Sequence, residues 1–115
     1  MHLLDAKAAL HGGRRRYWQF STNSIQRGPL DPEAIYVDAD EVTDLPALLS
    51  DLVRWFIADG TTVLNEEDCA AVEQTLRALS RMPDEGERAG LWRELADWLA
   101  ERDSHPVYLR LQRFR

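Results

Sequence analysis

The sequence has one cysteine, no long apolar run and no motif that names a reaction. Because Cys69 is the single cysteine, an internal disulfide is excluded and a cysteine-rich zinc site is disfavoured. No apolar run approaches the roughly 20 residues that a membrane-spanning helix needs. The arginines near the N-terminus follow the first apolar residues, which is the reverse of a secretory signal peptide. We therefore expect a chain of the reducing cytoplasm that contacts no membrane.

Catalytic patterns are missing as well. The histidines His2, His11 and His105 are scattered, without the close spacing of a zinc site. There is neither a glycine-rich phosphate loop nor a GxSxG turn. Cys69 falls in the first turn of an expected helix, yet it shares the apolar stripe of that helix, so a core position is favoured over a reactive thiol. The sequence therefore predicts no enzyme activity and no cofactor.

What is present suffices for one folded domain. The 115 residues are 44% hydrophobic and 30% charged, a composition typical of globular domains and unlike that of disordered chains. Neither a repeat nor a linker divides the chain. We expect residues 1–115 to form a single domain.

Three segments have the pattern of strands. "RRRYWQF" (14–20) is rich in aromatic residues, and "AIYVDA" (34–39) follows a stretch of turn residues. "HPVYLRLQRFR" (105–115) alternates apolar and polar residues with the period of a half-buried strand. Within the first segment, Trp18 and Phe20 should share one face of the strand.

Between these strands, apolar residues recur with the period of helices. We expect helices over residues 6–11, 44–59, 66–82 and 84–103, with Asp5 and Asn65 as N-caps and Gly60 and Pro83 as end signals. Strands at both ends with helices between them predict an α+β fold. A small antiparallel or mixed sheet, made of the N- and C-terminal strands, should pack against about three helices.

Charge is distributed unevenly along the chain, whose formal net charge is −6. Residues 1–30 carry five bases and one acid (+4), and residues 31–68 carry one base and eleven acids (−10). Residues 69–104 carry five bases and eight acids (−3), and residues 105–115 carry three bases (+3). If the terminal strands are neighbours, a positive region separate from the acidic middle should contain Arg14, Arg15, Arg16, Arg110, Arg113 and Arg115.

The stretch "YVDADEVTD" (36–44) holds four carboxylates and no base. On a helical wheel Asp44, Asp51 and Trp55 lie on one flank of the helix expected over 44–59, beside its apolar stripe. An acidic rim around an aromatic anchor is typical of electrostatically steered interfaces. The sequence therefore predicts that a basic protein partner binds at Asp38, Asp40, Glu41, Asp44, Asp51 and Trp55.

Other interpretations of these residues remain open. The acids could be solvated, with Asp44 stabilising the helix N-terminus and Trp55 packed under a loop. Asp38 and Asp40, about 7 Å apart on one strand face, could bracket a divalent cation, although no nearby histidine or lysine completes such a site. An alternative function is a small nucleic-acid-associated protein in which the arginines of 14–16 contact phosphates and Tyr17 and Trp18 stack on bases. The net charge of the chain opposes this alternative.

This profile, a small, acidic, cysteine-poor α+β chain without catalytic motifs, resembles that of bacterial immunity proteins, which neutralise a cognate toxin, often a basic nuclease. The resemblance is one of overall profile, and no residue role is taken from it. It implies an inhibitor whose negative surface covers the positive active site of the toxin. Electrostatic steering would raise the association rate, and buried anchor residues would set the lifetime of the complex.

Overall fold

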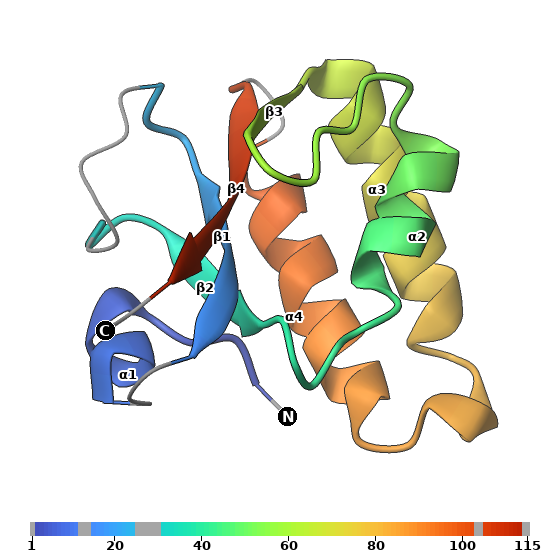
Figure 1. Ribbon diagram of the computed structural model, residues 1–115. Coiled ribbons are helices and arrows are strands. Elements are labelled where there is room, and N and C mark those ends of the chain that lie inside the picture. Colours follow the sequence, from blue (N-terminus) through green and yellow to red (C-terminus); the bar gives the residue numbers. More distant parts are fainter. Residues whose placement is uncertain (1, 12–14, 25–30, 103–104, 114–115) are drawn as a thin grey trace.

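The computed structural model describes residues 2–11, 15–24, 31–102 and 105–113. Its centre is a four-stranded antiparallel sheet (Figure 1). The strands are β1 (Arg16–Ser21), β2 (Ile35–Asp38), β3 (Thr61–Leu64) and β4 (Val107–Arg113), in the spatial order β2-β1-β4-β3. The helices are α1 (Ala6–His11), α2 (Leu45–Leu52), α3 (Glu66–Leu79) and α4 (Arg88–Ala100), and a 3₁₀ turn, η1, spans Pro83–Glu85. The expected α+β fold is confirmed.

The first and last strands lie in one sheet, as predicted, and the structure makes them neighbours at its middle. β1 pairs with β4 in antiparallel register, with Trp18 opposite Leu111 and Phe20 opposite Leu109. Because side chains alternate between the two faces of a strand, this register places the apolar residues of both strands on the same face.

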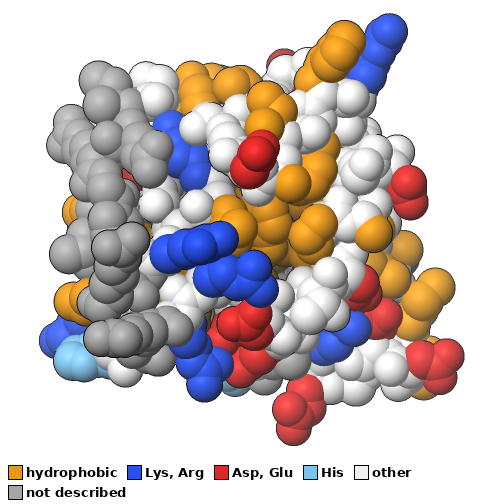
Figure 2. Space-filling model, viewed as in Figure 1, with side chains coloured by type: hydrophobic (Ala, Val, Ile, Leu, Met, Phe, Trp, Pro, Cys, Tyr) orange, Lys and Arg blue, Asp and Glu red, His pale blue; other side chains and the backbone are white. Residues whose placement is uncertain are grey.

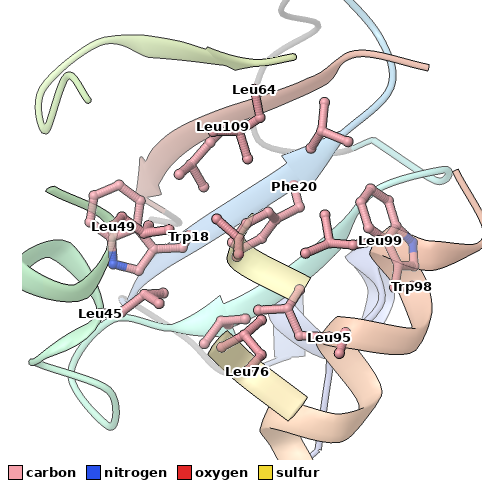
Figure 3. Close-up of a cluster of buried hydrophobic side chains, with 14 of the residues drawn as sticks. Trp18, Phe20, Leu45, Leu49, Leu64, Leu76, Leu95, Trp98, Leu99 and Leu109 are labelled. Atoms are coloured by element: carbon pink, nitrogen blue, oxygen red, sulfur yellow. The ribbon is translucent and has the colours of Figure 1, made fainter. Parts of the chain in front are cut away.

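The helices α2, α3 and α4 cover this apolar face and form the main core (Figure 1). Figure 3 shows Trp18 and Phe20 of β1 pointing toward leucines of the helices, among them Leu49 of α2 and Leu95 of α4. The Phe20 and Trp98 rings meet edge to face, with their centroids 6.5 Å apart. Burying each such side chain stabilises the fold by roughly 1.5–3 kcal/mol.

The opposite face of the sheet is buried too, but by a polar network. The Gln19 amide donates to the Tyr36 hydroxyl at 2.9 Å, and the same oxygen accepts the Asp31 amide at 3.0 Å. The Asp31 carboxylate accepts hydrogen bonds from Ser21, from Asn23 and from a backbone amide. The small residues of α1 pack beside this network against β2. The buried polar atoms are thus paired, as burial requires.

Two helix starts follow the expected capping chemistry. The Asn65 side chain accepts the Asp68 amide at 2.8 Å, and the Asp68 carboxylate accepts the Asn65 amide at 3.1 Å, which completes a capping box for α3. At α1 the Asp5 carboxylate accepts the Ala8 amide at 2.7 Å. Cys69 lies in the core, as predicted, and its burial, followed by the charge of Asp68, raises its thiol pKa to about 11.

The helices α2, α3 and α4 are shorter than predicted, most of all at the end of α2 and at the start of α4. α2 ends at Leu52 instead of continuing to residue 59, because the chain becomes extended at Val53 (φ −113°, ψ 115°) and Phe56 packs on the Trp18 ring. The segment after Gly60, which carried no prediction, forms β3. α4 begins at Arg88 rather than near residue 84, since the η1 turn ends at Gly86 with a positive φ of 56° that favours glycine.

Candidate functional site

The acids at the end of β2 are paired with arginines at the start of β1. The Asp38 carboxylate accepts a hydrogen bond from Arg15 at 2.7 Å, and the Asp40 carboxylate accepts one from Arg16 at 2.7 Å. The Glu41 carboxylate lies 3.9 Å from the Arg15 guanidinium. The hydrogen bond donated to Asp38 raises the pKa of Arg15. Because β1 and β2 are antiparallel neighbours, the start of one strand meets the end of the other. Their opposite charges are therefore neutralised within the molecule.

Asp44 is also paired, and it does not cap α2 with its side chain. It occupies the N-cap position, but its carboxylate makes no capping hydrogen bond and instead accepts the Arg88 guanidinium at 2.7 Å through both oxygens. Arg88 belongs to α4 and also lies over the Trp92 ring, 5.1 Å from its centroid. The pair therefore ties α2 to α4, and the hydrogen-bonded capping that the alternative interpretation of Asp44 allowed is not seen.

The expected separation of a basic region from the acidic middle is not what the structure shows. Arg15 and Arg16 are engaged by acids, and Arg110 is buried, with its guanidinium bonded to Thr61 and to the backbone carbonyls of Asn23 and Ser24. Arg14 and Arg115 lie outside the described residues. In Figure 2, red and blue side chains lie next to each other below the apolar patch at the centre of this face. The two signs of charge are therefore interleaved.

Asp51 and Trp55 remain exposed, although they do not share a helix. Asp51 is in α2, whereas Trp55 comes after the helix has ended, so the helical wheel that joined them is wrong for Trp55. Trp55 is 76% exposed, and the Arg54 guanidinium lies 5.4 Å from its ring centroid. Asp51 is exposed and forms no ion pair with any base in the described ranges. These two residues are the part of the predicted site that is open to a partner.

The segment that presents Trp55 is itself held in place. The Phe56 ring packs on Trp18, with the centroids 5.9 Å apart. The Ile57 amide donates to the Thr62 hydroxyl at 2.8 Å, and that hydroxyl donates to the Ile57 carbonyl at 3.2 Å. Gly60 fits closely here, because a Cβ at that position would lie 3.0 Å from Ile57. With Phe56 turned toward the core, its neighbours Trp55 and Ile57 are left exposed.

Two further large hydrophobic residues close to Trp55 in sequence are exposed, which the sequence did not reveal. Of the large hydrophobic residues that are exposed in the described ranges, Trp55, Ile57 and Val63 come from one stretch of nine residues, residues 55–63. Ile57 was missed because the helix was expected to continue to residue 59, and Val63 because the segment after Gly60 carried no prediction. Residues 55–57 are three consecutive hydrophobic residues, so the sequence has no alternation of apolar and polar residues that could have identified which side chains are exposed.

The aromatic residues of the first strand are not available to stack on bases. Tyr17 and Trp18 are buried, on opposite faces of β1. Burial, followed by the charge of Asp38, raises the pKa of Tyr17. A hollow of about 340 Å³ opens beside Tyr17, Asp38 and Glu41, and Arg15 also lines it. The nucleic-acid alternative thus loses the stacking platform on which it depended.

Metal-binding geometry is not found where the sequence offered it. Within residues 2–11, 15–24, 31–102 and 105–113, no three His, Cys, Asp or Glu side chains gather as a metal site requires. Asp38 and Asp40 differ in burial, and the Asp38 carboxylate accepts the Asp40 amide at 2.9 Å. Among the same residues, no helix has the length and apolar character to cross a bilayer.

Known proteins do not assign a role to this arrangement. No protein-family model, curated protein or solved structure matches the chain, so its function is argued from the contacts described above.

Proposed function

We propose that this chain is a protein-binding inhibitor of the immunity type, which neutralises a basic partner such as a toxin nuclease. The observation that carries the proposal is Trp55, which is 76% exposed on a segment anchored to the core and to β3. A monomer that leaves a large indole in water loses the stabilisation that burying this side chain would give. Tryptophan is also enriched among the residues that dominate the binding energy at protein interfaces. Trp55 therefore serves as the anchor of the interface.

The acidic surroundings of Trp55 favour a basic partner. Asp51 precedes it, Asp59 follows it, and neither acid has an ion-pairing base within 4.0 Å among the described residues. The chain as a whole carries −6. Exposed unpaired acids attract a basic protein at long range and raise its association rate, an effect that salt screens. Lysine and arginine of the partner would contact the acids at the rim while its apolar residues cover the indole.

The other four predicted residues have a lesser part in this proposal. Asp40, Glu41 and Asp44 are exposed but lie within 4.0 Å of their own arginines, so they contribute less to the field that a partner meets. Asp38 is buried. Reversing Asp44 to lysine would also break the tie between α2 and α4, which makes it a poor test of binding. Asp51 and Trp55 give the cleaner test.

The experiment places a photo-crosslinking benzoylphenylalanine at position 55 and, as the matched control, at position 82. Met82 is 50% exposed in the turn between α3 and α4, away from Trp55 in sequence and in element. In a lysate of the source organism, position 55 should crosslink to a basic protein that position 82 does not capture. Raising the salt concentration should reduce the yield.

The captured protein is then purified and its toxicity or nuclease activity is measured with and without the chain. Stoichiometric wild-type chain should abolish that activity. Trp55→Ala should weaken binding at least about thirtyfold, as expected for a residue at the centre of an interface, and Asp51→Lys should slow association. Equal crosslinking from positions 55 and 82, or a captured protein whose activity the chain leaves unchanged, would contradict the proposal.

A further inference from the structure

A described segment of the chain pairs with one edge of the sheet, and none pairs with the other edge. At the β2 edge, Leu4 forms a β-bridge with Tyr36, with N–O distances of 3.0 and 2.8 Å in the two directions. The N-terminal segment thus occupies hydrogen-bonding groups that β2 would otherwise present outward. At the β3 edge no described segment pairs with the strand from outside. Figure 1 shows β2 and β3 on opposite sides of the β1–β4 pair.

β3 also lacks the features that usually protect an edge strand. Its four residues, TTVL, include no charge and no proline, and its register with β4 runs without a bulge. Proteins normally prevent unwanted pairing at an edge with lysine, proline, bulges or a covering segment. By strand geometry, alternate residues of β3 direct their backbone N–H and C=O groups away from β4. These groups are available to an added strand.

The side chains around β3 suit an added strand on both faces. Val63 is 52% exposed and points to the face of the sheet opposite Thr62. Ile57, 47% exposed, lies on the other side, where its backbone is bonded to the Thr62 hydroxyl. Because side chains of an extended segment alternate, one set would meet Val63 and the other would meet Ile57. Val63 and Ile57 therefore flank the open edge.

Charges at the two ends of β3 decide which occupant fits. Asp59 precedes the strand and Glu66 and Glu67 follow it, all exposed and without an ion pair to a described base. A second copy paired antiparallel with Thr62 opposite Val63 would bring Asp59 of each copy to Glu66 of the other, and like charges opposite one another destabilise pairing. A segment with basic residues at its ends meets opposite charges instead.

The nearby described bases make no ion pair with these acids. Arg54 lies over the Trp55 ring, and Arg110 is buried and bonded to Thr61. Arg110 and Arg113 both line a hollow of about 240 Å³ with Asp59, but neither makes an ion pair with it. We propose that β3 binds an extended segment of the basic partner as a fifth strand, with basic side chains beside Asp59 and Glu66. This inference rests on the proposed function and names the way in which the partner is held.

The test uses a synthetic peptide, acetylated and amidated Arg-Arg-Val-Thr-Val-Arg-Arg, and the full chain labelled with nitrogen-15. We expect the amides of Thr61–Leu64 to shift on titration and to gain protection from hydrogen exchange. A peptide with alternate backbone amides N-methylated, and a peptide with glutamate in place of arginine, should each bind at least about tenfold more weakly, since one cannot donate to an edge and the other carries the wrong charge.

Variants of the chain complete the experiment. Val63→Lys places a charge on the open edge and should weaken binding of the arginine peptide at least tenfold. Met82→Lys adds the same charge outside β3 and should leave the affinity for the peptide unchanged. The proposal is overturned if β3 amides do not respond at about 1 mM peptide, a weak affinity by the standard of specific binding, or if both lysine variants behave alike. Concentration-dependent shifts of β3 without peptide would show a second copy at the edge and would also overturn it.

The crosslinking experiment separates this inference from the proposed function. If Val63→Lys retains the crosslink from position 55 and full inhibition of the captured protein, the edge pairing is wrong while the inhibitor proposal stands. If the peptide binds β3 as described but position 55 captures no basic protein, the edge is a peptide site and the inhibitor proposal fails.

Discussion

The exposure of Trp55 makes a quantitative prediction that separates stability from binding. The residue is 76% exposed, so about a quarter of the roughly 250 Å² that an indole can bury is covered, or about 60 Å². At about 25 cal/mol per Å² this area is worth about 1.5 kcal/mol, which is an upper estimate because the unfolded chain is not fully extended. Losing the exposed cation–π contact with Arg54 adds about 0.5 kcal/mol. Trp55→Ala should thus lower the free energy of unfolding by less than about 2 kcal/mol.

Trp92 provides the matched comparison within the same chain. It is 1% exposed, and its indole N–H donates to Glu85 at 2.8 Å. Truncating a buried tryptophan to alanine typically costs about 3–5 kcal/mol, so Trp92→Ala should be clearly more destabilising than Trp55→Ala. Both free energies of unfolding are measured by urea denaturation followed by circular dichroism, with folding at zero urea checked for each variant.

The comparison can refute the reasoning. If Trp55→Ala destabilises the chain as much as Trp92→Ala does, the Trp55 indole is packed in the fold and cannot act as a free anchor. If Trp55→Ala is mild but leaves affinity for the captured partner unchanged, the indole is exposed without being used. The proposal requires both a small loss of stability and a large loss of binding.

Two further predictions concern buried groups. Burial alone would raise the pKa of Asp31, but hydrogen bonds from Ser21, Asn23 and the Glu33 amide, with the charge of Arg110, lower it. The ionised carboxylate therefore stabilises the folded chain above the unfolded pKa of about 4, and this stability is lost as the pH falls below that value. Asp31→Asn should lower the free energy of unfolding by about 2–3 kcal/mol at neutral pH and remove part of its dependence on acid pH, whereas the exposed control Glu33→Gln should change neither. Equal urea midpoints of the wild-type chain across pH 2–7, roughly the range that spans both protonation states, would contradict this prediction. The Cys69 thiol, with its pKa raised to about 11, should react with iodoacetamide at pH 8 only as fast as the chain unfolds, and rapid labelling of the native chain would show that it is accessible.

Much of the secondary structure could be predicted because its causes are local in the sequence. The Asn65 and Asp68 capping box spans three residues, and it marks the start of α3. The alternation of Val107, Leu109 and Leu111 marks β4 for the same reason, since the period of two is a property of the strand itself. Strands at both ends of the chain with helices between them made an α+β fold the natural expectation, whereas the order of the strands did not follow from the sequence.

The residue at which α2 ends, and the pairing of the acids with arginines, depend on contacts between residues that are distant in the sequence. A continuous helical stripe extends to Phe56, but the chain leaves the helix at Val53 so that Phe56 can pack on Trp18, 38 residues earlier (56 minus 18). That departure exposes Trp55 and Ile57. Likewise, the pattern of acids shows an unopposed negative stretch, whereas β1 brings Arg15 and Arg16 to it in space.

For this chain, then, the sequence by itself determined most strands and helices, though not β3 or the end of α2, because hydrogen bonding, capping and side-chain period act over a few neighbouring residues. The tertiary structure alone decided which charges meet and which apolar residues are left uncovered. Asp44 is neutralised by Arg88, 44 residues away, whereas Asp51 has no such base among the described residues. Coulomb interactions and burial depend on distance in space, and only the packing of the sheet and helices sets that distance.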